Sequence, residues 1–404
     1  MKVLLVGSGG REHALAWKLV QSPLLTELHA APGNPGIAAL GHCHPVRADD
    51  AEAILGLARS LGIELVVVGP EVPLVTGLGD VLRRNGIAVF GPGRAAAAIE
   101  GSKRFAKEVM RAAGVSTSAD LSGPVAPCVL KADGLAAGKG VVVCRTQAEV
   151  ERGLAELASL PGPLVVEELL EGTEVSVFAL CDGADALTLT AAEDFKRAYD
   201  GDEGPNTGGM GSYAPVPGLD AAAVDELVEA IHRPVLAELS RRGMPFSGVL
   251  FAGLMLTANG PRVLEFNCRF GDPETQSLLP LLDGDLLAAC AAAASGDLSG
   301  VTLGQLPGAA VTVVLAAGGY PAFGCTGAEI SGVAEAEAAG ALVFHAGTAL
   351  RDGRLVTNGG RILNVTATGD DISSARTTAY AAADLIMWEA LRRREDIALA
   401  ASVV

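Results

Sequence analysis

The chain has 404 residues, of which 50% are hydrophobic and 19% are charged, and its formal net charge is −17. This length and hydrophobic share suit about two to three globular domains with real cores, which excludes a disordered or fibrous protein. The negative charge would repel nucleic acid, so we expect no nucleic-acid partner and a small ligand held by a few local cations.

Cysteine usage and apolar runs bear on where the protein works. The seven cysteines lie between Cys43 and Cys325 without a Cys-x-x-Cys pair, which favours reduced thiols over a disulfide framework. The first residues reach a glycine turn after too short an apolar core for a signal peptide. The longest apolar run, residues 286–294, is far below the roughly 18 residues that cross a membrane. We therefore expect a cytoplasmic protein with no membrane role.

The first 100 residues alternate buried-strand patterns with helical periodicity. Strands are predicted at residues 2–6, 64–68 and 87–90, and helices at 11–20, 51–60 and 74–84. This alternation predicts a doubly wound parallel sheet, and we take residues 1–100 as one domain. The turn Gly7-x-Gly9-x-x-Glu12 has an acid where a dinucleotide fingerprint needs a third glycine, which argues against nicotinamide binding.

Two features of this domain could contact a ligand. The free N–H groups at the start of the 11–20 helix can bind a phosphate. Glu71 follows a strand, at the edge where open parallel sheets bind their ligands. Each feature could equally be a structural turn, and the sequence alone leaves both interpretations open.

A glycine- and lysine-rich run, Lys131-Ala-Asp-Gly-Leu-Ala-Ala-Gly-Lys-Gly140, lies between predicted strands at residues 128–130 and 141–143. Its backbone N–H and ammonium groups could fold over a polyphosphate as an ATP lid. A P-loop is excluded, because Gly134 and Gly138 are separated by three residues and Lys139 is followed by glycine. A flexible hairpin without a ligand is the alternative.

The remaining elements define a central and a C-terminal domain. In the central domain, residues 101–308, helices are predicted at 102–113, 148–157 and 221–241, strands at 164–167, 174–180, 248–256 and 262–267, and a long loop at 200–217. The lid unit would cover about residues 118–172, and a loop as long as 200–217 is usually functional. Short strands at 311–315, 342–344 and 361–365 and a helix at 375–393 predict a third, mixed domain at 309–404.

Two acidic segments could contact a nucleotide. Glu265 and Asn267 are two apart on a predicted strand, so their oxygens leave one face, as Mg²⁺ ligands would, while Leu264 points to the core. Glu167 and Glu174 flank a turn that could offer acceptors to adenine and ribose. A solvent-facing strand and a solvated acidic turn, respectively, are the alternatives.

Five longer strings occur in one order along the chain. They are Gly7-Ser-Gly-Gly-Arg-Glu-His-Ala14, Lys131-Ala-Asp-Gly-Leu-Ala-Ala-Gly-Lys-Gly140, Gly204-Pro-Asn-Thr-Gly-Gly-Met-Gly211, Glu265-Phe-Asn-Cys-Arg-Phe-Gly-Asp-Pro-Glu-Thr-Gln276 and Thr357-Asn-Gly-Gly-Arg361. Together they resemble the phosphoribosylamine–glycine ligase family of the ATP-grasp superfamily, over essentially the whole chain. The resemblance implies an N-terminal doubly wound α/β sheet, a central α+β ATP-grasp domain with a small lid, and a C-terminal mixed α/β domain.

The resemblance also implies an activity. ATP, with Mg²⁺ or Mn²⁺, would activate glycine as a glycyl phosphate, and 5-phosphoribosylamine would displace the phosphate to give glycinamide ribonucleotide for purine biosynthesis. A carboxylate is a poor acylating agent, so both steps depend on positioning and charge stabilisation more than on a protein nucleophile. The implied partners are these small molecules, and the chain would be a monomer or a weak homodimer.

Roles for individual residues follow from the same resemblance. The ATP phosphates would be held by Lys103, Lys131, Gly134, Gly138, Lys139 and Gly140, the adenosine by Glu167, Glu168, Leu170 and Glu174, and the metal ion by Glu265 and Asn267. The substrates would be held by Gly9, Gly10, Glu71, Asp194, Lys196, Asn206, Thr207, Gly208, Gly209, Met210, Arg269 and Asp272. The catalytic residues would be Arg269, Lys131 and Asp194.

The chain departs from the family pattern in three places. Residues 115–127 are too few for the helix that similar ligases carry before the lid strand, so we expect a reduced outer edge of the lid. Glu193 stands where the family commonly has Gln. Residues 254–256 offer no carboxylate before the metal pair, so a second ion would depend on Glu265 and phosphate oxygens.

Other functions remain as alternatives. They are another ATP-grasp carboxylate–amine ligase or carboxylase, a nicotinamide oxidoreductase, and a nucleotide-binding regulator without turnover. Glu12 disfavours the oxidoreductase, and the second lysine with the metal pair disfavours the regulator. His42, Cys43 and His44 resemble metal ligands, but neighbours on a strand point to opposite faces and no partner pair has suitable spacing, so we expect no zinc site.

Overall fold

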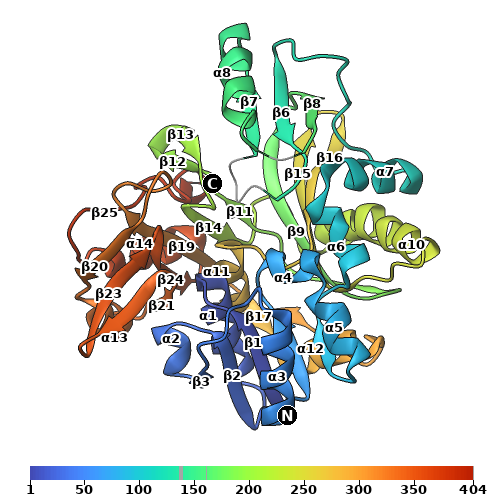
Figure 1. The fold of residues 1–404 in the computed structure, drawn as a ribbon. Helices are drawn as coiled ribbons and strands as arrows, with labels where there is room; N and C mark the ends of the chain where they lie inside the picture. Colours follow the sequence, from blue (N-terminus) through green and yellow to red (C-terminus); the bar gives the residue numbers. More distant parts are fainter. Residues whose placement is uncertain (136–139, 161, 404) are drawn as a thin grey trace.

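The computed structural model describes residues 1–135, 140–160 and 162–403. The expected phosphate contacts of Gly138 and Lys139 therefore lie outside the described residues. Figure 1 shows three sheet-based parts that meet at the centre of the molecule, with a small unit projecting from one of them. In the described ranges, no helix is both long and apolar enough to span a membrane.

The N-terminal part is built on a parallel sheet of five strands. The strand order is β3 (His42–Cys43), β2 (Glu27–Pro32), β1 (Lys2–Gly7), β4 (Leu65–Val68) and β5 (Ala88–Phe90). The helices of this part are α1 (Gly10–Leu19), α2 (Pro35–Ala38), α3 (Ala51–Leu61), α4 (Glu71–Thr76), α5 (Leu78–Arg84) and α6 (Arg94–Gly101). The strand order reverses at β1, which confirms the predicted doubly wound sheet.

The sequence pattern missed several of these elements. Strand β2 carries histidine, alanine and proline instead of a β-branched run, and β3 has only two residues, so neither gives a strand signal. One helix was predicted over 74–84, but Gly77 has φ +99° and separates α4 from α5. Helix α6, which ends at Gly101, was not predicted at all.

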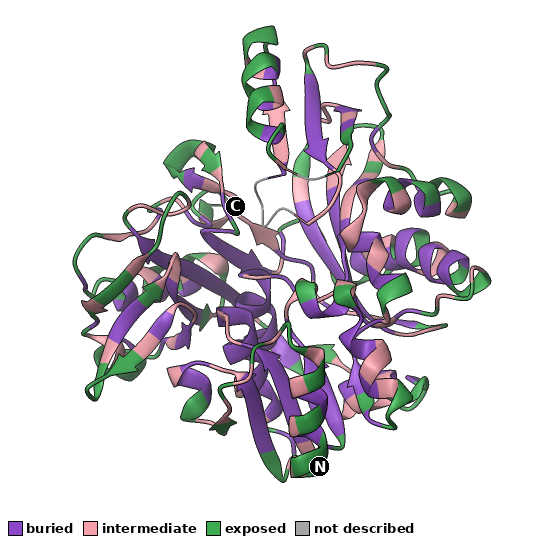
Figure 2. Cartoon of the chain, in the orientation of Figure 1, coloured by how far each residue is buried: buried purple, intermediate pink, exposed green. Residues whose placement is uncertain are grey.

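The central part contains an antiparallel sheet of four strands, β10 (Ala186–Thr188), β9 (Thr173–Asp182), β15 (Ser247–Thr257) and β16 (Gly260–Asn267). Its helices are α7 (Lys103–Ala113), α9 (Ala221–Leu227), the π-helical turn Val228–His232, α10 (Arg233–Arg241) and α12 (Leu286–Ser295). Helix α12 contacts β5, β9 and β15, so it joins the N-terminal sheet to the central sheet. Figure 2 shows buried residues concentrated on the strands of these sheets.

The projecting unit is a three-stranded antiparallel sheet with one helix. Its elements are β7 (Val141–Cys144), β6 (Cys128–Ala132), β8 (Leu164–Glu168) and α8 (Gln147–Leu157). Strands β6 and β7 pair antiparallel on the two sides of the glycine- and lysine-rich run, as predicted. Residues 115–127 form no helix, which agrees with their shortness in the sequence.

The C-terminal part is built on a six-stranded sheet. The sheet contains β11 (Glu193–Asp194), β14 (Gly211–Ala214), β19 (Ala309–Ala317), β24 (Arg361–Gly369) and β21 (Leu342–His345), and β25 (Leu391–Arg392) pairs with β19. The other elements here are β20 (Cys325–Glu329), β22 (Thr348–Arg351), β23 (Arg354–Gly359), α13 (Val333–Ala338) and α14 (Ile372–Ala383). Smaller elements are β12 (Arg197–Tyr199), β13 (Glu203–Asn206), α11 (Glu274–Leu278), β17 (Leu282–Asp283), β18 (Gly304–Gln305) and the 3₁₀ turns Asp200–Asp202, Leu279–Leu281 and Ala401–Val403.

Two predictions for these regions were wrong. The expected loop at 200–217 contains the strands β13 and β14, because β14 finds its partner in β19, about a hundred residues later in the chain. The helix predicted at 375–393 ends at Ala383, where the chain turns so that Ile386 and Trp388 enter the core and β25 joins the sheet. Helical periodicity does not distinguish such a buried turn from another helical turn.

Candidate active site

The lid reaches the strand that carries the expected metal ligands. Lys131 on β6 donates from Nζ to the backbone oxygen of Leu264 on β16 at 2.9 Å. Strand β15 pairs Gly253 with Glu265 and Leu254 with Val263, so Leu264 is the extra residue of a β-bulge. The bulge leaves the Leu264 carbonyl available to the lid, and it explains why this side chain is half exposed and not in the core as predicted.

Lys103 meets the lid from the start of α7. Asp133, just after β6, accepts a hydrogen bond from the Lys103 backbone N–H at 2.7 Å, and Lys103 Nζ donates to the Gly134 oxygen at 3.1 Å. Burial lowers the pKa of Lys103, with a contribution from Lys131, while the charge of Glu265 opposes the shift. The two lysines, Gly134 and Glu265 are therefore neighbours, as a shared triphosphate site would require.

Glu265 and Asn267 offer a carboxylate and an amide oxygen at the end of β16. The Asn267 Oδ1 atom accepts one hydrogen bond, from Arg269 Nη2 at 3.1 Å, and an amide oxygen has a second lone pair. Glu265 is half exposed, and its negative charge acts on Lys103 and on Asp194. Hard oxygen donors next to lysines that could bind phosphate are a suitable set for Mg²⁺.

The acidic turn after β8 is not simply solvated. Glu167 is buried, and its carboxylate accepts from Lys107 at 2.8 Å, from Lys131 at 2.7 Å and from Ser118 at 2.7 Å. Burial opposes ionisation, but the charge of Lys131 and these hydrogen bonds lower the pKa of Glu167 below its ordinary value. The solvated alternative is therefore wrong for Glu167, and its carboxylate oxygens already have partners.

The other residues expected at the adenosine differ in their surroundings. Glu168 accepts from the Ala119 N–H and from Arg262, both at 2.7 Å, which gives it a structural role in the lid. Leu170 lies half buried in the connection between β8 and β9. Glu174, at the start of β9, bonds with Lys196 Nζ at 2.6 Å.

An ion-pair network joins β9 to β11. Lys196 Nζ bonds with both Glu174 and Asp194 at 2.6 Å. Burial raises the pKa of Asp194, and although burial alone would lower the pKa of Lys196, the two carboxylates raise it. Glu274, which had no role assigned from the sequence, is buried nearby, and burial together with the charge of Asp194 raises its pKa to about 7.

Arg269 connects the central strand to the N-terminal part. Its guanidinium lies 3.2 Å from Glu100 on α6 and 3.5 Å from Glu71 on α4. Burial opposes the charged form, but the two carboxylates raise the pKa of Arg269, so it stays charged. Glu71 therefore lies beside Arg269, as expected of two residues at one site, while the slightly closer Glu100 was missed because α6 was not recognised.

The loop at 206–210 touches both the lid and the C-terminal sheet. Asn206 Nδ2 donates to the Val141 oxygen of the lid at 3.1 Å, and Thr207 Oγ1 donates to the Lys196 oxygen at 2.9 Å. Thr207 Oγ1 also accepts from the Gly209 N–H at 3.0 Å. Met210, expected at the substrate, is fully buried in the core of the C-terminal sheet, so its side chain is not available to a ligand.

Arg361 on β24 anchors two expected substrate segments. It donates to the Gly208 oxygen and to the Asp272 oxygen, the latter at 2.7 Å, and bonds with the Asp272 carboxylate at 2.9 Å. Asp272 also accepts from Gln276 at 2.8 Å, so both of its carboxylate oxygens have protein partners. In the sequence, Arg361 stood out only as the last residue of a resembling string, without a role.

The turn after β1 is occupied by an acid of the protein itself. Glu12 accepts from the Gly9 N–H at 2.6 Å, in the position where a dinucleotide phosphate would bind in a fingerprint turn. Gly10 is in close contact with the C-terminal sheet, since a Cβ there would lie 2.2 Å from Asn364 Nδ2. A pocket of about 460 Å³ next to this turn is lined by Gly7, Ser8, Gly9, Glu12, Pro32, Arg47, Ala48, Asp49, Pro70, Val72 and Pro73.

The histidines near β3 have a partner that the sequence did not show. His29 on β2 faces His42 in the parallel pairing, and its Nδ1 lies 3.0 Å from His44 Nε2. Within residues 1–135, 140–160 and 162–403, no three or more His, Cys, Asp and Glu side chains are grouped so as to hold a metal ion. The cluster is accounted for by hydrogen bonding and stacking between the rings.

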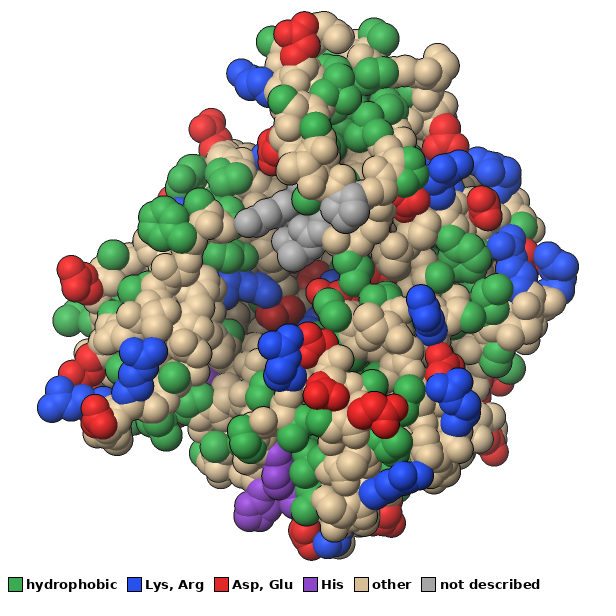
Figure 3. Space-filling view, in the orientation of Figure 1, with side chains coloured by type: hydrophobic (Ala, Val, Ile, Leu, Met, Phe, Trp, Pro, Cys, Tyr) green, Lys and Arg blue, Asp and Glu red, His purple; other side chains and the backbone are tan. Residues whose placement is uncertain are grey.

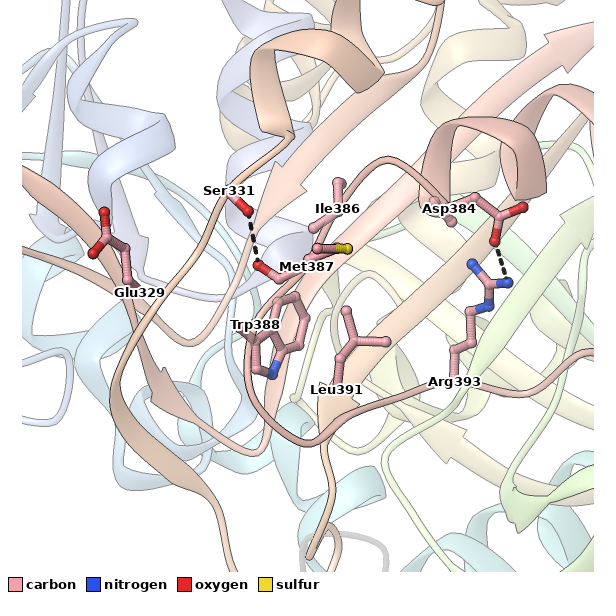
Figure 4. Close-up of a pocket in the computed structure, with 9 residues that line it drawn as sticks. Glu329, Ser331, Asp384, Ile386, Met387, Trp388, Leu391 and Arg393 are labelled. Atoms are coloured by element: carbon pink, nitrogen blue, oxygen red, sulfur yellow. Dashed lines mark hydrogen bonds and ion pairs between the residues drawn. The ribbon is translucent and has the colours of Figure 1, made fainter.

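A second pocket, of about 480 Å³, lies in the C-terminal part (Figure 4). Ile386, Trp388 and Leu391 contribute apolar lining, and an Arg393–Asp384 ion pair of 2.6 Å lies at one side. It contains none of the residues expected at the active site. In contrast, Figure 3 shows acidic and basic side chains together in a hollow at the centre of the molecule.

Comparisons with known proteins agree with this arrangement. Sequence models of the phosphoribosylglycinamide synthetase N domain, ATP-grasp (A) domain and C domain match residues 1–100, 101–275 and 310–400. A phosphoribosylamine–glycine ligase of Streptomyces coelicolor is 50% identical over 418 residues, covering 100% of both chains. One of Agrobacterium fabrum is 48% identical over 414 residues, covering 98% of both.

Solved structures give the same result. The crystal structure of phosphoribosylamine–glycine ligase from Thermotoga maritima has 35% identity and a TM-score of 0.85, and covers 98% of this chain and 100% of that one. The biotin carboxylase domain of Hydrogenobacter thermophilus 2-oxoglutarate carboxylase, solved with MgADP, ADP and bicarbonate, shares the fold at 18% identity with a TM-score of 0.71, covering 97% and 91%. The resemblance seen in the sequence strings is confirmed, and the chain belongs to the phosphoribosylglycinamide synthetase family.

Proposed function

We propose that this protein joins glycine to 5-phosphoribosylamine at the expense of ATP, giving glycinamide ribonucleotide, ADP and phosphate in purine biosynthesis. Family membership over nearly the whole chain supports this function. The observation on the site itself that carries most weight is the 2.9 Å contact of Lys131 with Leu264, next to Glu265. It joins the lid cation to the strand of oxygen donors, as the binding of one triphosphate from two sides requires.

In the nucleotide half of the proposed site, different residues would bind the phosphates and the metal ion. Lys103 and Lys131 would bind the phosphates from α7 and the lid, and Glu265 and Asn267 would hold Mg²⁺. The ion would neutralise negative charge on the phosphate oxygens during transfer. Arg269 stays charged between Glu71 and Glu100, so it can orient the glycine carboxylate and stabilise charge as the glycyl phosphate forms.

The amine half of the site must remove a proton. When the amine of phosphoribosylamine attacks the glycyl carbonyl, its nitrogen gains a positive charge and then loses H⁺ as phosphate leaves. Asp194 has an oxygen, Oδ1, fixed by Lys196 at 2.6 Å, which leaves Oδ2 to accept this proton. Burial raises the pKa of Asp194, which makes its carboxylate a stronger base.

The proposal also covers the domain boundaries, the choice of metal ion, the cellular location and the oligomeric state. We take domains at residues 1–100, 101–308 and 309–404 with a lid at about 118–172, which the three matched family domains support. Mn²⁺ accepts the same oxygen ligands, so either Mg²⁺ or Mn²⁺ would support the reaction. The protein would be cytoplasmic, where thiols stay reduced, and a monomer or weak homodimer; all seven cysteines lie in the described ranges and are free.

The proposal is tested by phosphate release from the purified protein. Release should require ATP, Mg²⁺, glycine and freshly prepared phosphoribosylamine together, and omission of glycine should abolish it. Glu265→Gln and Lys131→Met should each lower turnover by roughly a hundredfold or more, with circular dichroism unchanged, whereas the exposed Glu335→Gln should match the wild type. Release that continues without glycine, or that bicarbonate supports in its place, would favour the carboxylase alternative.

A further inference from the structure

Lys107 lies one helical turn after Lys103 on α7 and is buried beneath the nucleotide site. Its ammonium group has three acceptors: Glu167 Oε1 at 2.8 Å, the Ser118 backbone oxygen at 2.7 Å and Asp120 Oδ1 at 2.7 Å. An ammonium has three N–H groups, so these contacts account for all of them. Lys107 therefore has no donor left for a ligand, and any effect on the nucleotide must pass through a neighbour.

The neighbour is Glu167, which is shared between two lysines. Lys107 bonds with Oε1, whereas Oε2 accepts from Lys131 Nζ and Ser118 Oγ, both at 2.7 Å. The two oxygens of the carboxylate thus have separate partners, and its orientation is fixed from both sides. Because Glu167 also bonds with Lys107, its negative charge is not directed at Lys131 alone, and Lys131 keeps more of its positive field towards the site.

Lys131 is in turn held at two points. Its Nζ bonds with Glu167 Oε2 and with the Leu264 backbone oxygen at 2.9 Å, which uses two of its three N–H groups among the described residues. The third N–H group can be directed to a phosphate oxygen. Its direction depends on Glu167, and the direction of Glu167 depends on Lys107.

We propose that Lys107 is a positioning residue for nucleotide binding, which acts through Glu167 to aim Lys131 at the ATP phosphates. The inference rests on the proposed function, since it takes the ATP site as its target. Without Lys107, Glu167 would form a one-to-one pair with Lys131, which would neutralise the lid cation and free the carboxylate to rotate. ATP should then bind more weakly, while the chemistry after binding should change much less.

The test compares variants by steady-state kinetics and by calorimetric titration with MgADP. Lys107→Met should raise the KM for ATP and the Kd for MgADP roughly tenfold, with a smaller change in kcat, and Lys107→Arg should recover part of the loss. Arg111→Met is the matched control. It removes a cation from the same helix and a 3.2 Å contact with the same Asp120, but Arg111 is exposed and does not contact Glu167. It should behave as the wild type.

The double variant Lys107→Met with Glu167→Gln separates positioning from general stability. If Lys107 acts through Glu167, the double variant should bind no more weakly than Glu167→Gln alone. If the losses of MgADP affinity in the two single variants were additive in the double variant, the proposal would be overturned. Equal KM values for ATP in Lys107→Met and Arg111→Met would overturn it as well. If Lys107→Met is unfolded at the assay temperature, Ser118→Ala serves instead, because it removes another bond that orients Glu167. Unchanged MgADP binding by Ser118→Ala would then overturn the proposal.

The binding measurement keeps this inference separate from the proposed function. Absence of glycine-dependent phosphate release by the wild type would contradict the proposed function. MgADP titration would still test Lys107 in that case, because it needs no turnover. A wild type that is active while Lys107→Met matches it would contradict the positioning role alone.

Discussion

Glu193 is a half-buried acid beside Asp194, the base proposed for the reaction. Its Oε2 accepts a hydrogen bond from the Tyr213 hydroxyl at 2.6 Å. Burial, together with the charges of Asp194, Asp202 and Glu174, raises the pKa of Glu193, although the bond from Tyr213 opposes the shift. The folded state therefore holds this proton more tightly than the unfolded chain, so stability is lost as pH rises from the ordinary carboxyl pKa through the raised one.

Glu193→Gln should remove that loss. The amide has the same shape and still accepts from Tyr213, but it carries no charge at any pH. We expect the variant to have a higher free energy of unfolding than the wild type at pH 8, and a smaller difference between the two at pH 5. Urea unfolding at both pH values measures this, with the exposed Glu335→Gln as control. Parallel pH profiles for the wild type and Glu193→Gln would contradict it.

Residues differ in how far their roles can be read from sequence. Lys131 and Glu265 stand in motifs whose spacing alone suggests phosphate and metal contacts, and the structure places them in neighbouring positions. Glu100 and Lys107 gave no such signal, because Arg269 and Glu167, with which they pair in the site, are 60 or more positions away in the chain. A buried ion pair becomes visible only when the fold has brought both halves together.

Among the elements, helix α7 depends on the lid for its N-terminal cap. Ser102 Oγ accepts from the Phe105 N–H at 3.2 Å, and Asp133 accepts from the Lys103 N–H at 2.7 Å and from Ser102 Oγ at 3.3 Å. A carboxylate at this end also interacts favourably with the helix dipole. The same turn of helix carries Lys103, so the cap both stabilises α7 and fixes a cation of the site.

Asp133→Ala should therefore affect stability and nucleotide binding together. The lost cap should cost about 1 kcal/mol of unfolding free energy, and a displaced Lys103 should raise the KM for ATP severalfold. Asp50→Ala provides the control, since Asp50 caps α3 through the Ala53 N–H at 3.0 Å, far from these residues in the fold. It should lose similar stability without a change in KM. An equal KM effect in both variants would show that the loss is general.

Helices and strands were predictable where the local sequence pattern favours the same structure as the tertiary contacts. The apolar run of β1 and the capped, periodic helix α7 were found close to their true bounds. Strand β14, with the sequence Gly-Ser-Tyr-Ala, was taken as loop, because only its pairing with β19 and its complete burial make it a strand. The break after α14 was missed for the same reason, since β25 is defined by β19.

At the scale of the whole molecule, the residues of the proposed site come from the N-terminal, central and C-terminal parts. Glu71 comes from the N-terminal part, Glu265 from the central sheet, and Asp194 from β11, which belongs to the C-terminal sheet although it precedes residue 309. The sequence placed all three in the site by resemblance, but it did not show that the middle of the chain crosses into the last sheet. The domain boundary proposed at residue 309 therefore does not coincide with the C-terminal sheet, which includes β11 and β14 from the middle of the chain.

Arg361 on β24 bonds directly with Gly208 and with Asp272, so its loss should disturb the 206–210 loop. Arg361→Met removes the anchor of Gly208 and leaves the Asp272 carboxylate, 14% exposed, with Gln276 as its remaining side-chain partner. Loss of one partner from a largely buried ion pair should cost about 3 kcal/mol of unfolding free energy. Displacement of the 206–210 loop should lower kcat/KM for phosphoribosylamine by roughly a hundredfold.

The control for this prediction is another arginine in the same part of the fold. Arg354 on β23 pairs with Glu329 at 2.8 Å, but both side chains are exposed, so Arg354→Met should change stability by less than about 1 kcal/mol and leave kcat/KM unchanged. Urea unfolding and initial rates, taken where every variant is folded, measure the two effects separately. If Arg361→Met lost stability but kept its kcat/KM for phosphoribosylamine, Arg361 would be a structural link between sheets and the 206–210 loop would not depend on it.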